Sequence, residues 1–433
     1  MVEISEHFKS RQPSAIRLAQ LEFLKRKDGA KAVNVAIGNV SLPMHPAMQE
    51  RMFNLKKDSP FKDGVVKYSA TPGYEETNQA FLNIIASSGF NTEGLYSQIT
   101  DGGSQAMELV IVGTAGPAGT KEKPFMLIDA AYANYNALAK RTGRATVSIR
   151  RHLEEHGKFR IPDISEIEAI IQKHNPGAML VIPYDNPTGH FYDHKTMVEL
   201  AKLCVKYDMW MISDEAYREL HYIDHETVSV WGLTDKEILG IQGRRISIET
   251  SSKVWNACGL RIGALVTDNE KFHEKAVAEN TAALCSNVIG QYIFGALAHE
   301  NHTDLKDWYD KQRSYYKRML TVFTETMKKK LPGVIVSSPD ASIYSVIDVR
   351  NLVKQNFKSV DFVLYCAQKG KVMVDEEATT LLVAPMSGFY SSVEGEKNPG
   401  DTQFRIAYVL TPSDMQKVPG LFAELFNQYN SKN

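Results

Sequence analysis

The chain has 433 residues, of which 43% are hydrophobic and 23% charged, values that are ordinary for a globular protein of two or three domains. Its 50 basic and 51 acidic side chains give a formal net charge of −1, so no global field favours nucleic acid or an anionic membrane.

No apolar run reaches the ~18 residues of a transmembrane helix. The four cysteines form no C-x-x-C pair and no zinc-ligand spacing, which predicts reduced cysteines and no metal site. The charged N-terminus lacks an apolar secretory core, so we expect a cytoplasmic protein.

The middle of the chain alternates short apolar runs with amphipathic segments. The runs FMLIDA, AMLVIPY, MWMISDE, RISIET and IGALVTD predict buried strands over residues 125–130, 178–184, 209–215, 245–250 and 262–268. Helix-like segments, such as those over 164–174 and 194–207, lie between them. This alternation predicts an α/β fold with a mostly parallel sheet flanked by helices.

The alternation of apolar runs and amphipathic segments gives way to a different pattern after about residue 300. A long charged periodic segment predicts a helix over 303–330, and the remaining segments predict three strands and a last helix, over 334–338, 342–349, 404–410 and 413–430. We therefore expect a large domain over 46–300. A smaller α+β domain would be formed by 1–45 together with 301–433.

Polar residues follow several of the predicted strands, where a parallel sheet presents groups to a ligand. In ITDGGSQAMELV (99–110), a strand runs into Gly102, Gly103 and Ser104 before a helix opens. Glycines permit close backbone approach, and a helix N-terminus offers free N–H groups, which together suit a phosphate. Taken alone, the same turn is also typical of an ordinary helix start.

Two further strand ends carry an amide, a carboxylate and a phenol. Asn186 follows a strand in YDNPTGHFYD, where it either caps a tight turn or points its amide toward a ligand. Asp214 ends the strand in ISDEAYREL, where it either caps the next helix or meets a cation such as a protonated ring nitrogen. Tyr217 follows three residues later and could face the same crevice.

The segment TSSKVWNACGLRIG (250–263) places Lys253 after Thr250, Ser251 and Ser252, and eight residues before Arg261. A desolvated lysine beside a cation is a nucleophilic amine suited to Schiff-base formation. The hydroxyls and the arginine fork suit a phosphate, without distinguishing which serine contacts it. A single lysine is otherwise most often a surface residue.

One ligand satisfies all four sites, because pyridoxal 5'-phosphate carries an aldehyde, a phosphate, a ring nitrogen and a phenolic oxygen. The aldehyde would meet Lys253, and the ring nitrogen would meet Asp214, which keeps the ring an electron sink. The phenolic oxygen would meet Asn186 and Tyr217. The phosphate contacts would come from Gly103, Ser104, Thr250 and Arg261.

The motifs T-S-S-K-x5-G-L-R-I-G, D-N-P-T-G and S-D-E-A-Y, in this order, resemble those of the class I/II aminotransferases, the pyridoxal-phosphate enzymes of fold type I. The resemblance runs over most of the chain. It implies a large domain with a seven-stranded-type sheet, a smaller α+β domain, and a homodimer. It also implies a ping-pong Schiff-base reaction that moves an amino group from an L-amino acid to a 2-oxo acid.

The resemblance carries over further residues. In IDAAYANY, Tyr132 would stack on the cofactor ring, although alanines stand where the family usually has prolines. In YSATPGYEE, Tyr68 would reach the phosphate of the neighbouring subunit, although the usual L-R of this segment is absent. Gly38 and Arg405 would bind the substrate carboxylate together with Asn186. The remaining implied cofactor contacts are Gln105 and Ser252.

Other activities use the same scaffold. A C–S lyase that works by β-elimination remains the alternative, and half-reaction with a 2-oxo acid would separate the two. A DNA-binding regulator would need an upstream domain, for which Gly38 comes too early. A nicotinamide enzyme would need G-x-G-x-x-G, which the Gly102–Gly103 turn lacks. The segment 276–290 contains no Lys or Arg, which disfavours a dedicated aspartate enzyme.

Overall fold

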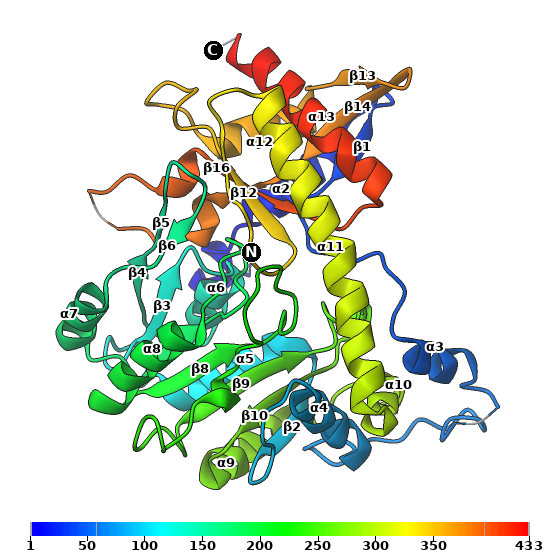
Figure 1. Cartoon of the computed structure of the whole chain (residues 1–433), viewed down its shortest axis with the longest axis vertical. Coiled ribbons are helices and arrows are strands. Elements are labelled where there is room, and N and C mark those ends of the chain that lie inside the picture. The colour runs from blue at the N-terminus through cyan, green and yellow to red at the C-terminus, as the bar shows by residue number, and fades with distance from the viewer. Residues whose placement is uncertain (1, 58, 394, 432–433) are drawn as a thin grey trace. The chain divides into compact units, whose positions relative to one another are not determined.

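The computed structural model describes residues 2–57, 59–393 and 395–431, and Figure 1 traces its helices and strands. The chain forms two compact units that combine segments distant in sequence: unit 1 comprises Met1–Gly38, Met319–Ser338 and Tyr344–Asn433, and unit 2 comprises Asn39–Arg318 and Pro339–Ile343. The functional domains expected over 46–300 and over the rest of the chain stay a prediction. No helix of the described residues is long and apolar enough to cross a membrane.

Unit 2 contains a seven-stranded sheet, which confirms the predicted mostly parallel α/β fold. In spatial order its strands are β2 (Tyr96–Thr100), β10 (Gly263–Thr267), β9 (Arg245–Thr250), β8 (Trp210–Asp214), β7 (Ala178–Val181), β3 (Phe125–Asp129) and β4 (Thr146–Arg150). Only β10 runs against the others, since it pairs antiparallel with both β2 and β9. The carboxyl ends of the other strands therefore meet at one edge.

Helices cover this sheet, and a short hairpin of β5 (His152–Leu153) and β6 (Phe159–Arg160) follows β4. The α-helices over this part of the chain are α3 (Pro46–Phe53), α4 (Glu75–Ser87), α5 (Gly102–Thr114), α6 (Asn134–Arg141), α7 (Ile164–His174), α8 (His194–Lys206), α9 (Glu270–Asn280), α10 (Val288–Gly295) and α11 (His302–Lys330), of which α4, α5, α7, α8 and α9 pack on strands of the sheet. The boundary between the units falls inside α11, after Arg318.

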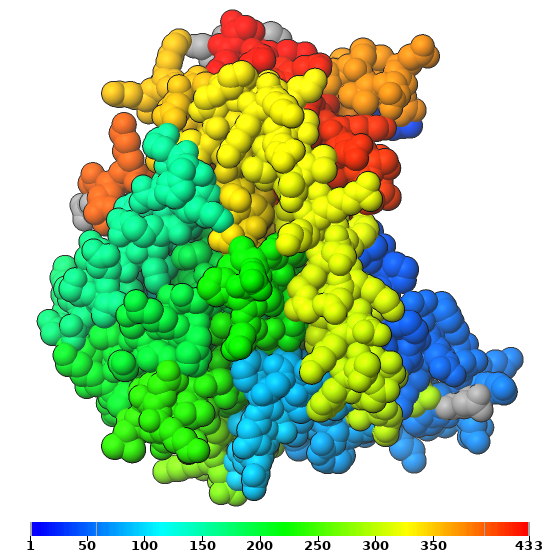
Figure 2. All heavy atoms as spheres, viewed as in Figure 1, coloured from blue at the N-terminus to red at the C-terminus, as the bar shows by residue number. Residues whose placement is uncertain are grey.

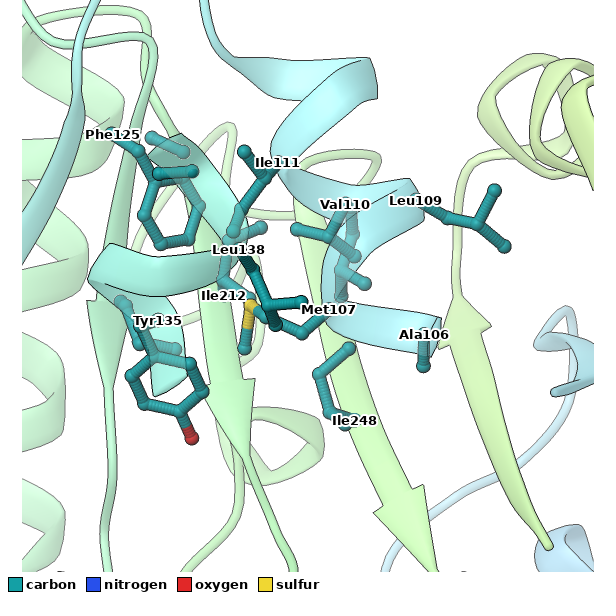
Figure 3. Close-up of a cluster of buried hydrophobic side chains, with 14 of the residues drawn as sticks. Ala106, Met107, Leu109, Val110, Ile111, Phe125, Tyr135, Leu138, Ile212 and Ile248 are labelled. Carbon is teal, nitrogen blue, oxygen red and sulfur yellow. The ribbon is translucent and has the colours of Figure 1, made fainter. Parts of the chain in front are cut away.

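The core of unit 2 lies between the sheet and helices α5 and α6 (Figure 3). Met107 and Val110 share the buried face of α5 because they are three residues apart. Figure 3 shows Met107 beside Leu138 of α6 and Ile212 of β8. Strand β3 is buried along its whole length, as its continuous apolar run predicts for a strand covered on both faces.

The described residues of unit 1 form two smaller sheets, several helices and the C-terminal part of α11. One sheet has the order β1 (Lys31–Asn34), β14 (Glu377–Leu382), β13 (Val372–Val374), and the other β11 (Ile335–Val336), β12 (Tyr344–Asp348), β16 (Gln403–Ala407), β15 (Ala384–Pro385). The helices are α1 (Glu6–Lys9), α2 (Ala15–Leu24), α12 (Ser359–Gln368) and α13 (Pro412–Asn430). Its core includes packed rings of Phe362, Phe404 and Phe422, with centroids 5.3–5.5 Å apart.

Candidate active site

The sequence-predicted residues of unit 2 gather at the carboxyl edge of its sheet. Asp214 is the last residue of β8, and Thr250 is the last residue of β9. Strand β2 ends at Thr100, directly before the Gly102–Gly103 turn, and Asn186 follows β7. Open parallel sheets bind ligands at this edge.

Asp214 presents a carboxylate held by two donors. Its Oδ1 accepts from the backbone N–H of Ala216 at 3.1 Å, and its Oδ2 accepts from the hydroxyl of Tyr135. Burial raises the pKa of Asp214, and the nearby carboxylates of Glu249 and Asp185 add to that rise, while the two hydrogen bonds oppose it. A carboxylate this poorly solvated is stabilised by a cationic partner.

Tyr135 is a site residue that the sequence interpretation missed. It lies in α6, and its ring packs edge-on against that of Tyr132 with centroids 5.4 Å apart. Burial raises its pKa well above the ordinary value, with Asp214 adding to the rise, so the phenol stays protonated and donates to the carboxylate. Tyr132 precedes α6, which begins at Asn134, so helical spacing along the sequence does not reveal that the two rings meet.

Asn186 and Tyr217 come together between neighbouring strand ends. Asn186 Nδ2 donates to Tyr217 Oη at 3.4 Å, and the two residues are 6% and 2% exposed. The amide and the phenol thus lie together at this edge of the sheet.

The two serines that follow β9 make different hydrogen bonds. Ser251 is fully buried, and its Oγ donates to the carbonyls of Ile262 at 2.9 Å and Ala257 at 3.2 Å, so this hydroxyl holds the turn itself. Ser252 Oγ instead lies 2.8 Å from Thr250 Oγ1. Lys253 follows, partly buried.

Two hydrogen bonds within unit 2 hold the segment that follows Lys253. Trp308 Nε1 donates to the carbonyl of Val254 at 2.8 Å, and Asn256 Nδ2 donates to the carbonyl of Pro43 at 3.0 Å. These bonds restrict the backbone that carries the lysine.

The start of α5 forms a cradle beside Arg261. Its N-cap residue, Asp101, makes no side-chain capping bond, so the first N–H groups keep their capacity for an anion. Arg261 Nη2 donates to the carbonyl of Asp101 at 3.4 Å. A Cβ added at Gly102 would lie 2.4 Å from Arg261 Nη2, and one added at Gly263 would lie 2.6 Å from Gly103 N. The glycines are therefore required for this close approach.

Other predicted residues lie elsewhere or are engaged differently. Gln105 Oε1 accepts from the Asp101 N–H at 2.6 Å and its Nε2 donates to Asn280 Oδ1 at 3.0 Å, so its amide organises the turn. Ser104 is exposed in the first turn of α5. Tyr68 is 78% exposed.

Gly38 and Arg405 belong to unit 1. There Arg405 Nη2 donates to the carbonyl of Ala36 at 2.6 Å, close in sequence to Gly38. Its guanidinium lies over the rings of Tyr344 and Phe389, 4.4 and 4.9 Å from their centroids. This strand arginine is buried among aromatic rings rather than paired at the surface.

A separate cavity of about 630 Å³ in unit 2 contains none of the predicted site residues. It is lined by Ser87–Gly89, by the segment 219–227 and by one face of α11, which lie side by side in Figure 2 as light blue, green and yellow. Its central cation, Arg313, already pairs with Glu219 and Asp310. The chemistry of the predicted site therefore lies away from this cavity.

A family model described as "Aminotransferase class I and II" matches residues 56–418. The chain belongs to this family. An aspartate/prephenate aminotransferase of Aquifex aeolicus, named as probable, is 26% identical over 197 residues, covering 46% of the chain and 48% of that relative. An aspartate aminotransferase of Bacillus subtilis is 24% identical over 261 residues, covering 60% of the chain and 61% of that relative.

These matches thus span about half to three fifths of the length of the curated relatives. A solved structure of an aspartate aminotransferase mutant from Thermus thermophilus superposes with a TM-score of 0.79 at 19% identity, covering 98% of the chain and 100% of that structure. This likeness confirms the fold expected for the class I and II aminotransferases.

Proposed function

We propose that the chain is a pyridoxal-phosphate-dependent aminotransferase that moves an amino group from an L-amino acid to a 2-oxo acid in two half-reactions. The observation that carries the proposal is the gathering of Asp214, the Asn186–Tyr217 pair, Lys253 and the Arg261 cradle at one sheet edge. These four groups differ in chemistry, and each suits a different part of this one cofactor.

The donor set fits the cofactor at both of its ends. The uncapped start of α5, the exposed Arg261 and the paired hydroxyls of Thr250 and Ser252 suit a phosphate. The partly buried carboxylate of Asp214 suits a protonated ring nitrogen. When bound, pyridoxal phosphate would supply an aldehyde for an amine and an electron-withdrawing ring.

The roles of the remaining residues follow from their chemistry. Lys253 would bind the aldehyde through its amine and then remove the proton from the substrate Cα as general base. Asn186 and Tyr217 would donate to the phenolic oxygen. Tyr132 would cover a ring face, and Tyr135 would keep Asp214 ionised by donating to it.

We propose Arg405, Gly38 and Asn186 as the residues that bind the substrate carboxylate. An arginine can bind a carboxylate through two parallel hydrogen bonds, which fix its position and its orientation. This would align the Cα–H bond for removal. The rings of Tyr344 and Phe389 support this role because they hold the guanidinium in one orientation.

We also propose a homodimer in which Tyr68 reaches the phosphate of the neighbouring subunit. Phe53, Val65, Val66 and Tyr68 are 72%, 52%, 54% and 78% exposed, an apolar surface that a second copy would cover.

The test is a screen of the twenty amino acids with 2-oxoglutarate and pyruvate as acceptors, in which new amino acid and free ammonia are both measured. We expect new amino acid in amounts equal to the donor consumed, without ammonia. Release of ammonia and pyruvate from a sulfur-containing donor, with no amino transfer, would favour the C–S lyase instead.

A further inference from the structure

Three ionisable side chains that have no role in the proposed reaction are buried just behind the strand ends. Glu215, Arg218 and Glu249 are each 3% exposed. Arg218 Nη1 and Nη2 donate to the two carboxylate oxygens of Glu249 at 2.8 and 2.9 Å, and Nη1 also donates to Glu215 Oε2 at 3.4 Å. A bidentate fork between an arginine and a carboxylate fixes both distance and direction.

Each carboxylate also accepts hydrogen bonds from groups outside the fork. Glu215 Oε1 accepts from Ser213 Oγ at 2.8 Å, Ser229 Oγ at 2.9 Å and the N–H of Val230 at 3.0 Å. Glu249 Oε1 also accepts from Ser247 Oγ at 2.8 Å. Since both ends are held, a change in the fork would move the turns that it joins.

The fork links the turn after β8 to the end of β9, next to the point where the pairing of these two strands ends. The pairing of β8 with β9 ends at Asp214 opposite Ile248, and one further bond runs from Glu215 N to Ile248 O at 3.0 Å. Arg218 lies after Tyr217 on the turn that follows β8, and Glu249 lies within β9, directly before its last residue, Thr250. The fork therefore continues the link between the turns through side chains.

We propose that Arg218 is a positioning residue that, by gripping Glu249, sets the spacing between the Asp214–Tyr217 turn and the Thr250–Lys253 turn for a ligand held at both ends. The inference rests on the proposed function, because pyridoxal phosphate is the ligand with a ring for one turn and a phosphate for the other. Stability alone gives a weaker account of the fork, since apolar residues often replace a buried ion pair without loss.

The test compares a two-ended ligand with its separate ends on the full-length cofactor-free chain. The double variant Arg218→Met/Glu249→Leu removes both partners of the fork, so that neither is left as an unpaired buried charge. Dissociation constants are measured for pyridoxal phosphate, for pyridoxine, which has the ring without the aldehyde that Lys253 would bind, and for inorganic phosphate.

We expect the constants of pyridoxine and of phosphate to change by less than ~3-fold, whereas that of pyridoxal phosphate rises by ~10-fold or more. The reason is that joint binding of two linked groups depends on their spacing, and binding of either alone does not. Glu249→Gln, which keeps the side-chain shape and weakens the fork, should give a smaller rise of the same kind.

The matched control lies at the other end of β9. Arg245 and Asp268 form a similar pair at 2.7 Å with side chains 9% and 8% exposed. Arg245→Met/Asp268→Leu should change the free energy of unfolding but leave the affinity for pyridoxal phosphate unchanged.

Three results would overturn the inference: unchanged affinity for pyridoxal phosphate in both fork variants, equal losses in the fork and control double variants, or matching losses for pyridoxine or phosphate alone. Failure of the wild-type chain to bind pyridoxal phosphate would instead remove the proposed function, and the inference with it.

Discussion

Gly102→Ala tests the proposed phosphate site most sharply, because the structure predicts two separable effects. Gly102 has φ +72°, so an alanine there costs ~1–2 kcal/mol in the free energy of unfolding. Its Cβ would also lie 2.4 Å from Arg261 Nη2 and 2.9 Å from Cζ, which forces the guanidinium away. Hydrogen bonds to charged groups contribute ~1.5–3 kcal/mol, so the loss of this contact should weaken pyridoxal phosphate binding by ~10- to 150-fold.

Gly94→Ala is the matched control. Gly94 has φ +74°, and no atom of the described residues lies within 4 Å of the position of its added Cβ. It should therefore lose similar stability without losing affinity. The assays are urea unfolding and titration of the cofactor-free chain with pyridoxal phosphate. If both variants bind as tightly as the wild type while losing similar stability, Arg261 does not grip the phosphate and the reasoning is wrong.

Three other predictions concern the remaining groups. Tyr135→Phe removes a donor to the carboxylate of Asp214 and so raises the pKa of Asp214 further. When the pH is lowered, the variant should therefore lose affinity for pyridoxal phosphate at a higher pH than the wild type does. Superimposable pH profiles would contradict this. Arg405→Lys should raise the KM for the amino donor by ~10- to 100-fold with cofactor affinity unchanged, because lysine lacks the fork; an unchanged KM would refute the assignment. Mixed dimers of Tyr68→Ala and Lys253→Ala subunits should retain one intact site, roughly half of wild-type activity, if Tyr68 acts across the interface, and little activity if it acts within its own subunit.

Local signals account for the elements that the sequence predicted well. The helix expected over 164–174 is α7 with the same limits, because a capping box joins Asp163 and Glu166 at its start and Asn175 ends it in the left-handed conformation. The apolar runs became sheet strands because only burial on both faces accommodates them.

The sequence does not reveal which strands pair when they lie far apart along the chain. Strand β1 is short and only partly buried, and its parallel partner β14 lies more than 300 residues later, so no local pattern reveals the pair. The direction of β10 likewise depends on the short connection from β9, which returns the chain antiparallel, and apolar content does not encode it.

In the candidate site, too, the sequence predicted the residues that local motifs mark but not the contacts between distant side chains. Motif order and residue chemistry placed Asp214 and Lys253 at strand ends, as observed. The sequence does not show that the Ser251 hydroxyl donates to backbone carbonyls whereas Ser252 contacts Thr250. The Arg218–Glu249 fork joins residues 31 positions apart through their side chains, which a pattern along the chain does not show.

The central claim is that Lys253 is the amine that holds pyridoxal phosphate. Reduction of the cofactor-bound chain with borohydride, followed by peptide mapping, tests this without knowledge of the substrate. The account predicts a pyridoxyl group on the peptide that contains Lys253, and its loss in Lys253→Ala. A label on another lysine, or no label on a chain that binds the cofactor, would contradict it.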